Sequence, residues 1–201
     1  MNESLLRAMT AERDAVTRMI EDTRGQYDAV AELFLHCRGR VVFMGIGKSG
    51  HIGAKLAATF SSTGTPAIFV HAAEACHGDF GMIRPEDVAV LISNSGTTRE
   101  VLQNLPPLRA IGCTTVAFTA GKDSPLARGC DYVLLYPKAE EADHLHLAPT
   151  VSSTLALVLG DALACAVSEA RGFTREDFHR YHPNGALGDM LQKESKSAKA
   201  P

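Results

Sequence analysis

The chain has 201 residues, of which 45% are hydrophobic, and a formal net charge of -3 at pH 7. This length and apolar content fit one globular domain with a sizeable core. Because no region is densely basic, the composition argues against nucleic-acid binding, whereas a phosphorylated small molecule needs only one or two cations.

The sequence also favours a cytoplasmic protein. Residues 1–13 are polar and lack the apolar core of a signal peptide, and polar residues interrupt the most apolar stretch, 151–167. We therefore expect neither export nor membrane insertion. The five cysteines are scattered and never spaced as Cys-x-x-Cys, which is typical of reduced thiols in apolar surroundings.

From the N-terminus, residues 1–39 are charged and periodic, and they predict extra helices, split near Gly25, that belong to the same domain. Five apolar runs rich in β-branched residues then predict buried strands, at residues 41–44, 67–70, 88–92, 114–118 and 132–135.

Helical patterns lie between these runs. Ile52, Leu56 and Phe60 repeat at four-residue spacing, residues 98–111 predict a helix bent at Pro106-Pro107, and Ser124-Pro125 opens a short helix. The alternation predicts the α/β class: an open doubly wound five-stranded parallel sheet with helices on both faces.

The last predicted helix is apolar and covers residues 151–170, so a second subunit could bury part of it. It ends at Arg171-Gly172. The tail, residues 192–201, is rich in lysine, serine and alanine, and we expect it to be disordered. No second domain is predicted.

Two loops of small residues carry the strongest functional signal. Residues 45–50 follow the first predicted strand, and residues 93–98 follow the third. Glycines let backbone N–H groups approach an anion, hydroxyls add donors, and the start of the following helix carries partial positive charge. Loops after parallel strands meet in one crevice, so we expect a phosphate site there.

The motifs around these loops resemble the sugar isomerase (SIS) domain family and, within it, the arabinose-5-phosphate isomerase branch. The resemblance covers residues 40–191 and rests on these stretches: 45–53 (GIGKSGHIG), 62–66 (STGTP), 77–79 (HGD), 93–96 (SNSG), 147–150 (LAPT), 160–164 (GDALA), 170–173 (ARGF), 182–183 (HP) and 185–188 (GALG). It implies a flavodoxin-like fold in residues 40–191.

The resemblance also implies an aldose-ketose isomerase that interconverts D-ribulose 5-phosphate and D-arabinose 5-phosphate through an enediolate. The family's catalytic residues align with Lys48, Glu100, Glu141 and His182. We expect Glu141 to move the carbon-bound proton, with Glu100 supporting or sharing that role, and His182 to open the ring or relay a proton. Which glutamate is the base stays open. Substrate and phosphate contacts are expected from Gly47, Ser49, Ser93, Ser95, Thr98 and His77.

By the same resemblance, the protein is a homo-oligomer, a dimer or tetramer with sites at subunit contacts, and a histidine can enter a site from a neighbour. Many members carry two cystathionine-β-synthase-type modules after the isomerase domain, and we expect this chain, which ends at Pro201, to lack them. The family's Glu-Ala-Cys-Pro pattern reads Glu141-Ala142-Asp143-His144 here, so the exact sugar phosphate stays open.

Several alternatives remain. The chain could be a sister enzyme such as 6-phospho-3-hexuloisomerase, or a module that binds a sugar phosphate without converting it. His144 and His146 would share a face if their stretch were extended, and Asp143 and His77 could complete a metal site. Enediol chemistry needs no metal, however, so we expect none.

A nicotinamide cofactor is also not expected. Lys48 and Ser49 interrupt the glycine pattern of a dinucleotide fingerprint, and no acidic residue ends the second predicted strand. We therefore expect the reaction to use no cofactor.

Overall fold

The computed structural model describes residues 1–22, 27–184 and 190. Its helices are α1 (Asn2–Asp22), α2 (Asp28–Leu35), α3 (Gly47–Ser62), α4 (Arg99–Leu102), α5 (Leu105–Ile111), α6 (Pro125–Gly129), α7 (Val151–Ala170) and α8 (Arg175–Tyr181), with 3₁₀ turns η1 (Ala75–His77) and η2 (Asp79–Met82). Its strands are β1 (Val41–Gly45), β2 (Ala67–His71), β3 (Val88–Ile92), β4 (Thr114–Thr119) and β5 (Tyr132–Leu135). The predicted split at Gly25, the motif at 185–188 and the tail at 192–201 lie outside the described residues.

The five strands form one parallel sheet in the order β2-β1-β3-β4-β5. This is the flavodoxin-like doubly wound order, which confirms the predicted fold class. The chain reverses direction across the sheet between β1 and β3, where Met44 pairs with Leu91. Loops leaving β1 and β3 therefore lie side by side at the carboxyl edge, the usual ligand site of such sheets.

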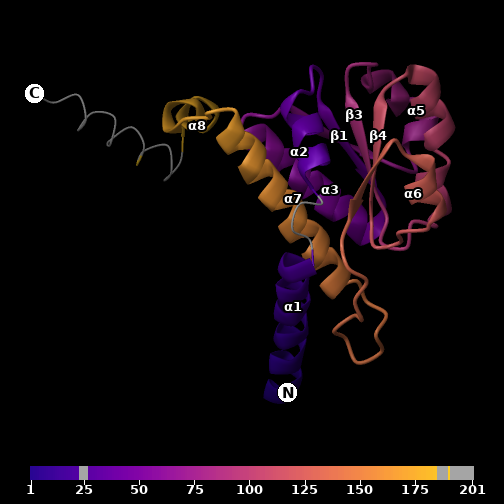
Figure 1. The fold of residues 1–201 in the computed structure, drawn as a ribbon, viewed down its shortest axis with the longest axis vertical. Coiled ribbons are helices and arrows are strands. Elements are labelled where there is room, and N and C mark those ends of the chain that lie inside the picture. Colours follow the sequence, from indigo (N-terminus) through magenta and orange to yellow (C-terminus); the bar gives the residue numbers. More distant parts are fainter. Residues whose placement is uncertain (23–26, 185–189, 191–201) are drawn as a thin grey trace, which may run out of the picture.

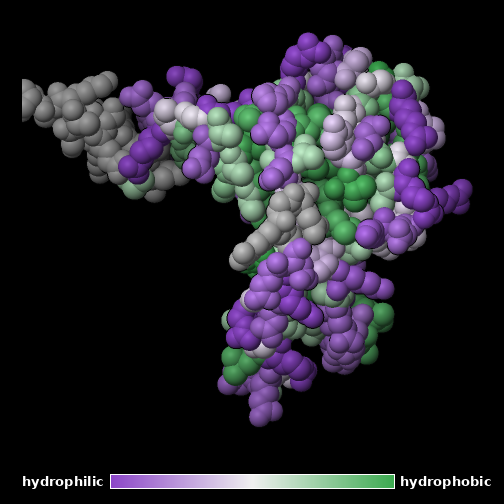
Figure 2. Space-filling view, viewed as in Figure 1, coloured by the Kyte–Doolittle hydropathy of each residue, from purple (hydrophilic) through white to green (hydrophobic). Residues whose placement is uncertain are grey.

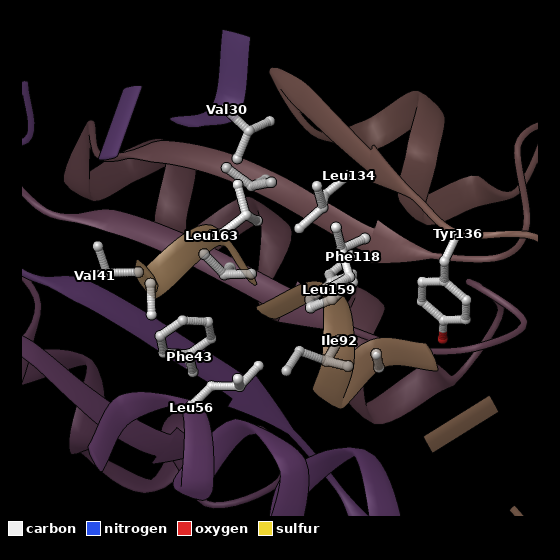
Figure 3. Packing of buried hydrophobic residues seen from close by; sticks show 14 of the residues in the cluster. Val30, Val41, Phe43, Leu56, Ile92, Phe118, Leu134, Tyr136, Leu159 and Leu163 are labelled. Atoms are coloured by element: carbon white, nitrogen blue, oxygen red, sulfur yellow. The ribbon is translucent and has the colours of Figure 1, made fainter. Parts of the chain in front are cut away.

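Alternate residues along each central strand face opposite layers of helices. Phe43 and Ile92 pack in a core with α2, α3 and α7, and Figure 3 shows them with Leu56 and Leu159. Met44 and other residues of the second face pack with the helices α4, α5 and α6. Figure 1 shows these two layers on either side of the sheet. Double coverage explains why the buried strands read as continuous apolar runs.

The predicted helix over 98–111 is two helices, and the break precedes the prolines. Asn104 occupies the N-cap position of α5 without a side-chain capping bond, and Pro106 lies in the first turn, where a missing N–H costs nothing because that group has no partner inside the helix. The prediction of a bend at Pro106-Pro107 was therefore displaced by a few residues. Helix α8 was not predicted, although Thr174 and Asp177 form a capping box at its start.

Helix α1 projects from the body as an arm, with the loop of residues 137–150 beside it (Figure 1). Its C-terminal half is anchored, because Ala15 and Met19 are buried and the Thr154 hydroxyl donates to Glu12 Oε2 at 2.9 Å. The N-terminal half leaves Leu5 and Met9 exposed. Figure 2 shows apolar green among the purple of this lower lobe.

Helix α7 is long and apolar enough, by length and composition, to cross a membrane, and half of that window is buried in the protein. Its buried face packs on α3 and the sheet. These contacts are those of a core helix. The opposite face stays open in one chain, and its residues include Ala162, Cys165 and Ala166.

Candidate functional site

Residues from four segments converge at the carboxyl edge of the sheet. They surround a small cavity of about 50 Å³, which is lined by Lys48, Ser49, Ile52, Asn94, Tyr136, Pro149, Ser152, Ser153 and Ala156. The loops after β1, β3 and β5 and the start of α7 thus meet at one place. The two predicted phosphate loops are neighbours, as the strand order requires.

The first loop leaves space for an anion. Gly47 has a φ of +54°, a conformation that other residues rarely adopt, and a Cβ placed there would meet nothing within 4 Å. Lys48 is exposed beside it. Both residues lie in the first turn of α3, where backbone N–H groups lack partners inside the helix. An anion here would meet open N–H groups and an ammonium.

The second loop is held by its own hydroxyls. Ser93 and Thr98 share a hydrogen bond of 2.8 Å between their hydroxyls, and the Ser93 hydroxyl also accepts from the Gly96 N–H. Ser93 is buried, so it shapes the loop from beneath, whereas Ser95 is exposed. A Cβ on Gly96 would lie 2.1 Å from Ser124 Oγ, which requires glycine at this position.

Three donors of the second loop remain open. Within the described part of the chain, the backbone N–H groups of Asn94, Ser95 and Thr98 make no hydrogen bond. These groups of the loop can bind an anion directly. Of the predicted phosphate contacts in this loop, Ser95 and Thr98 therefore have both a hydroxyl and a free N–H.

Glu141 is fixed at the start of α7. Its Oε2 accepts hydrogen bonds from the Thr150 N–H at 2.8 Å, the Thr150 hydroxyl at 3.2 Å and the Ser152 N–H at 3.2 Å. This carboxylate caps the helix, where negative charge is favourable. Its Oε1 has no hydrogen-bond partner among residues 1–22, 27–184 and 190. One oxygen is anchored and the other is open to a ligand.

Tyr136 was not predicted as a site residue. It directly follows β5 and belongs to the buried cluster drawn in Figure 3. Its ring packs edge-to-face on Phe118 with ring centroids 5.5 Å apart, and the residue lines the cavity. Burial, and then the nearby charge of Glu141, raise the pKa of its phenol, so the hydroxyl stays protonated at neutral pH. Its position immediately after a strand was the only signal in the sequence.

Glu100 and His77 reach the same edge from the second helical layer. His77 lies on η1 after β2, and Glu100 lies on α4 after the second loop; both side chains are exposed. The fully buried Asn104 side chain connects the two segments by donating to the carbonyls of Glu100 at 2.6 Å and Ala72 at 3.0 Å. The backbone near these two residues is thus held together.

His182 is far from the other predicted catalytic residues within one chain. It caps α8, and its Nδ1 lies 3.0 Å from the Phe178 carbonyl while its ring stacks on Phe178. Glu141 is at one end of α7 and α8 follows the other end, and a helix of 20 residues is about 30 Å long (Figure 1). One chain therefore does not assemble all four residues.

The stretch that could have formed a metal site is a turn. His146 has a φ of +55°, and its N–H donates to the Asp143 carbonyl at 3.0 Å. His144 and His146 thus lack the extended backbone that a shared face required. Among the described residues, no group of three His, Cys, Asp or Glu side chains is placed to hold a metal ion.

Comparison with known proteins agrees with this geometry. Residues 34–166 match the SIS domain family. The chain is 50% identical over 188 residues to the arabinose 5-phosphate isomerase KdsD of Pseudomonas aeruginosa, and 47% identical over 183 residues to that of Escherichia coli K12. These matches cover 94% and 91% of this chain but 58% and 56% of those proteins, so it spans little more than half their length.

This chain is also similar to a solved structure, and the similarity covers most of both chains. A protein of Escherichia coli CFT073, determined in complex with arabinose 5-phosphate, superposes with a TM-score of 0.87 at 49% sequence identity. The match covers 89% of this chain and 95% of that one.

Proposed function

The chain belongs to the SIS domain family, and from this premise we propose that it interconverts D-ribulose 5-phosphate and D-arabinose 5-phosphate. The names of the KdsD relatives and the arabinose 5-phosphate bound to the similar Escherichia coli structure support this substrate. The observation that carries the proposal is the position of Glu141, fixed with one free oxygen at the start of α7 next to the cavity lined by Lys48 and Ser49.

The phosphate would bind between the two loops. Open N–H groups at Gly47, Ser95 and Thr98 provide donors for its oxygens, and Ser49 lies in the same first turn as Gly47. The Lys48 ammonium is near enough to the cavity to neutralise part of the charge, or to stabilise the enediolate oxygen. Ser93 would hold the loop rather than touch the ligand, because it is buried.

The reaction would move two protons. From ribulose 5-phosphate, the free Glu141 oxygen takes a proton from C1, and the electron pair of that C–H bond forms the C1–C2 double bond of the enediolate. Return of the proton to C2, with transfer of the O1 hydroxyl proton to O2, gives the aldose. Tyr136, held protonated beside the cavity, can donate a hydrogen bond to either oxygen.

The histidine would come from a second copy. The open face of α7 lies in the half of the helix nearer α8, where Ala162, Cys165 and Ala166 are exposed. Pairing α7 antiparallel with its copy across a two-fold axis would cover this face. The same pairing would bring α8 of the second copy, with its His182, toward Glu141. We therefore propose a homo-oligomer with shared sites.

We also propose that the reaction takes place in the cytoplasm. Sugar phosphates are charged and do not cross bilayers unaided, so an isomerase acting on them works where they are made.

Incubation of the purified protein with ribulose 5-phosphate and a chelator tests the activity. Nuclear magnetic resonance should show arabinose 5-phosphate, and in heavy water the product should carry deuterium at C2. Binding without turnover or exchange would contradict the proposal and favour a sugar-phosphate-binding module. Turnover lost only with chelator present would contradict the metal-free chemistry.

A further inference from the structure

One histidine of this chain adopts a backbone conformation that most side chains avoid. His146 is the only described residue other than glycine with a positive φ, at +55°. Such conformations persist where surrounding contacts fix them, and they concentrate at functional sites. The residue lies in the turn between Glu141 and α7.

Its ring binds the backbone of the proposed base. His146 Nδ1 lies 2.8 Å from the Glu141 carbonyl oxygen, and that contact is a hydrogen bond donated by the ring. A carbonyl only accepts, so the neutral ring carries its proton on Nδ1 and leaves Nε2 as an acceptor. This bond closes the turn from Glu141 to His146 through the backbone of Glu141 and leaves its carboxylate to cap α7.

The Asp143 side chain stabilises the same turn by accepting hydrogen bonds from its backbone. Its carboxylate accepts from the N–H groups of Leu145 at 3.1 Å, Leu147 at 2.8 Å and Ala148 at 2.9 Å. Slight desolvation opposes ionisation, but these three bonds lower the pKa of Asp143. The turn is therefore a built structure rather than an irregular loop.

The turn borders a larger cavity beside the proposed active site. This cavity, of about 600 Å³, lies between α1 and the turn and is lined by Arg7, Ala11, Asp14, Thr17, Arg18, Glu140, Glu141, Ala142 and His146. The Glu141 side chain thus borders solvent in this cavity, and its carboxylate is held only by the hydrogen bonds from the start of α7. A carboxylate that borders a cavity of this size needs a second point of support to keep its position.

We propose that His146 is a positioning residue for Glu141, which it holds by the backbone so that the free carboxylate oxygen stays aimed at the substrate. The inference rests on the proposed isomerase function, because it assigns Glu141 the proton transfer. The anchor at Thr150 fixes one carboxylate oxygen, and the imidazole fixes the carbonyl of the same residue. Together they restrain both ends of Glu141.

Two substitutions separate this role from simple relief of backbone strain. His146→Gly removes the ring but suits the positive φ, so a residue that only fills the turn could be replaced without loss. His146→Asn also accepts this φ, and its side-chain amide reaches about as far as Nδ1, so it can restore the hydrogen bond. His144→Asn, at an exposed neighbour outside this contact, is the matched control.

We expect kcat of His146→Gly to fall about ten- to a hundred-fold, as for a misplaced catalytic group, with KM within about two-fold of wild type. His146→Asn should recover most of that loss, and His144→Asn should match wild type. Wild-type kcat in the glycine variant, or an asparagine variant as slow as the glycine variant, would overturn the proposal.

Hydrogen exchange separates this proposal from the isomerase activity itself. Amides of residues 145–150 should exchange faster in His146→Gly and return to wild-type rates in His146→Asn. Unchanged amide exchange in His146→Gly would overturn the positioning role of His146 even if turnover fell. A wild-type protein inactive on both pentose phosphates would overturn the proposed function, while the exchange rates would still decide whether the ring restrains Glu141.

Discussion

Glu141 and Thr150 are nine residues apart, and the carboxylate of the first caps the helix that begins after the second. Glu141 Oε2 accepts from the Thr150 N–H at 2.8 Å and from its hydroxyl at 3.2 Å. The contact joins the loop after β5 to the start of α7, and it fixes the carboxylate in orientation as well as in place. It also makes Glu141 the residue whose substitution is most informative.

Glu141→Gln should lower turnover about 10²- to 10⁴-fold, because the amide keeps an acceptor for the α7 N–H groups but cannot take a carbon-bound proton. The initial rate with ribulose 5-phosphate measures this change. Glu169→Gln is the control, since Glu169 is an exposed carboxylate at the end of α7 away from Glu141. Equal losses in both variants would mean that general surface charge, not Glu141, matters.

Lys48→Met should raise KM for the sugar phosphate and leave the free energy of unfolding nearly unchanged. Lys48 is exposed in the first turn of α3, so its loss removes a cation from the site without opening the core. Steady-state kinetics at two salt concentrations measure the effect, and the salt dependence of KM should weaken in the variant. If KM and kcat both stay at wild-type values, Lys48 does not contact the phosphate or the enediolate.

Much of the fold could be predicted because its signals are local. Runs such as Val88–Ile92 are buried on both faces and so read as strands, and Ser124 caps α6 by accepting from the Ala127 N–H at 3.2 Å, as its place before Pro125 indicated. The capping box of α8 was also local, and it was overlooked.

The site was predictable only where strand order determined it. The loops with Lys48 and Ser95 had to be neighbours once the sheet was parallel and doubly wound. The capping of α7 by Glu141 depends on how a nine-residue loop folds back, which periodicity does not encode. The separation of His182 from Glu141 depends on the course of a long helix and, in our proposal, on a second chain.

Asp131 should contribute stability that is lost in acid. The Thr115 hydroxyl donates to its carboxylate at 2.7 Å and, with the Thr115 N–H at 2.8 Å, lowers the pKa of Asp131. A lowered pKa favours the folded state above the unfolded value, near 3.9, and this advantage disappears as the pH falls through the folded value.

Asp131→Asn should therefore lower the free energy of unfolding at pH 7, by less than about 1 kcal/mol because the group is exposed. Urea titrations of both proteins at equal concentration should show this difference, and it should vanish once Asp131 is protonated in the folded state. A difference of the same size at every pH would indicate lost packing instead of charge.

The cysteines should separate into reactive and inert groups. Burial raises the pKa of the Cys113 thiol to about 11 and that of Cys130 to about 12, so both should resist alkylation at pH 8. Cys76 is exposed and should react quickly. Mass spectrometry after a short iodoacetamide pulse distinguishes them, and rapid labelling of Cys113 in folded protein would contradict this burial.

Cys165 tests the proposed subunit contact. It is exposed on the open face of α7 in a single chain, so pairing of α7 with a second copy should protect it. Its labelling should be slow at high protein concentration and faster on dilution, whereas Cys76 should label at the same rate throughout. Fast labelling of Cys165 in a verified oligomer would place the subunit contact elsewhere.

Mixed oligomers test whether the site is shared between chains. Glu141→Gln and His182→Gln should each be nearly inactive alone, since each lacks one group for proton transfer. If His182 acts on the Glu141 of another chain, a mixed dimer has one site with both groups intact and one with neither. Random pairing in a 1:1 coexpression makes half of the dimers mixed, so activity should recover to about a quarter of wild type. A site built within one chain would give no recovery, because every chain in the mixture lacks one of the two groups.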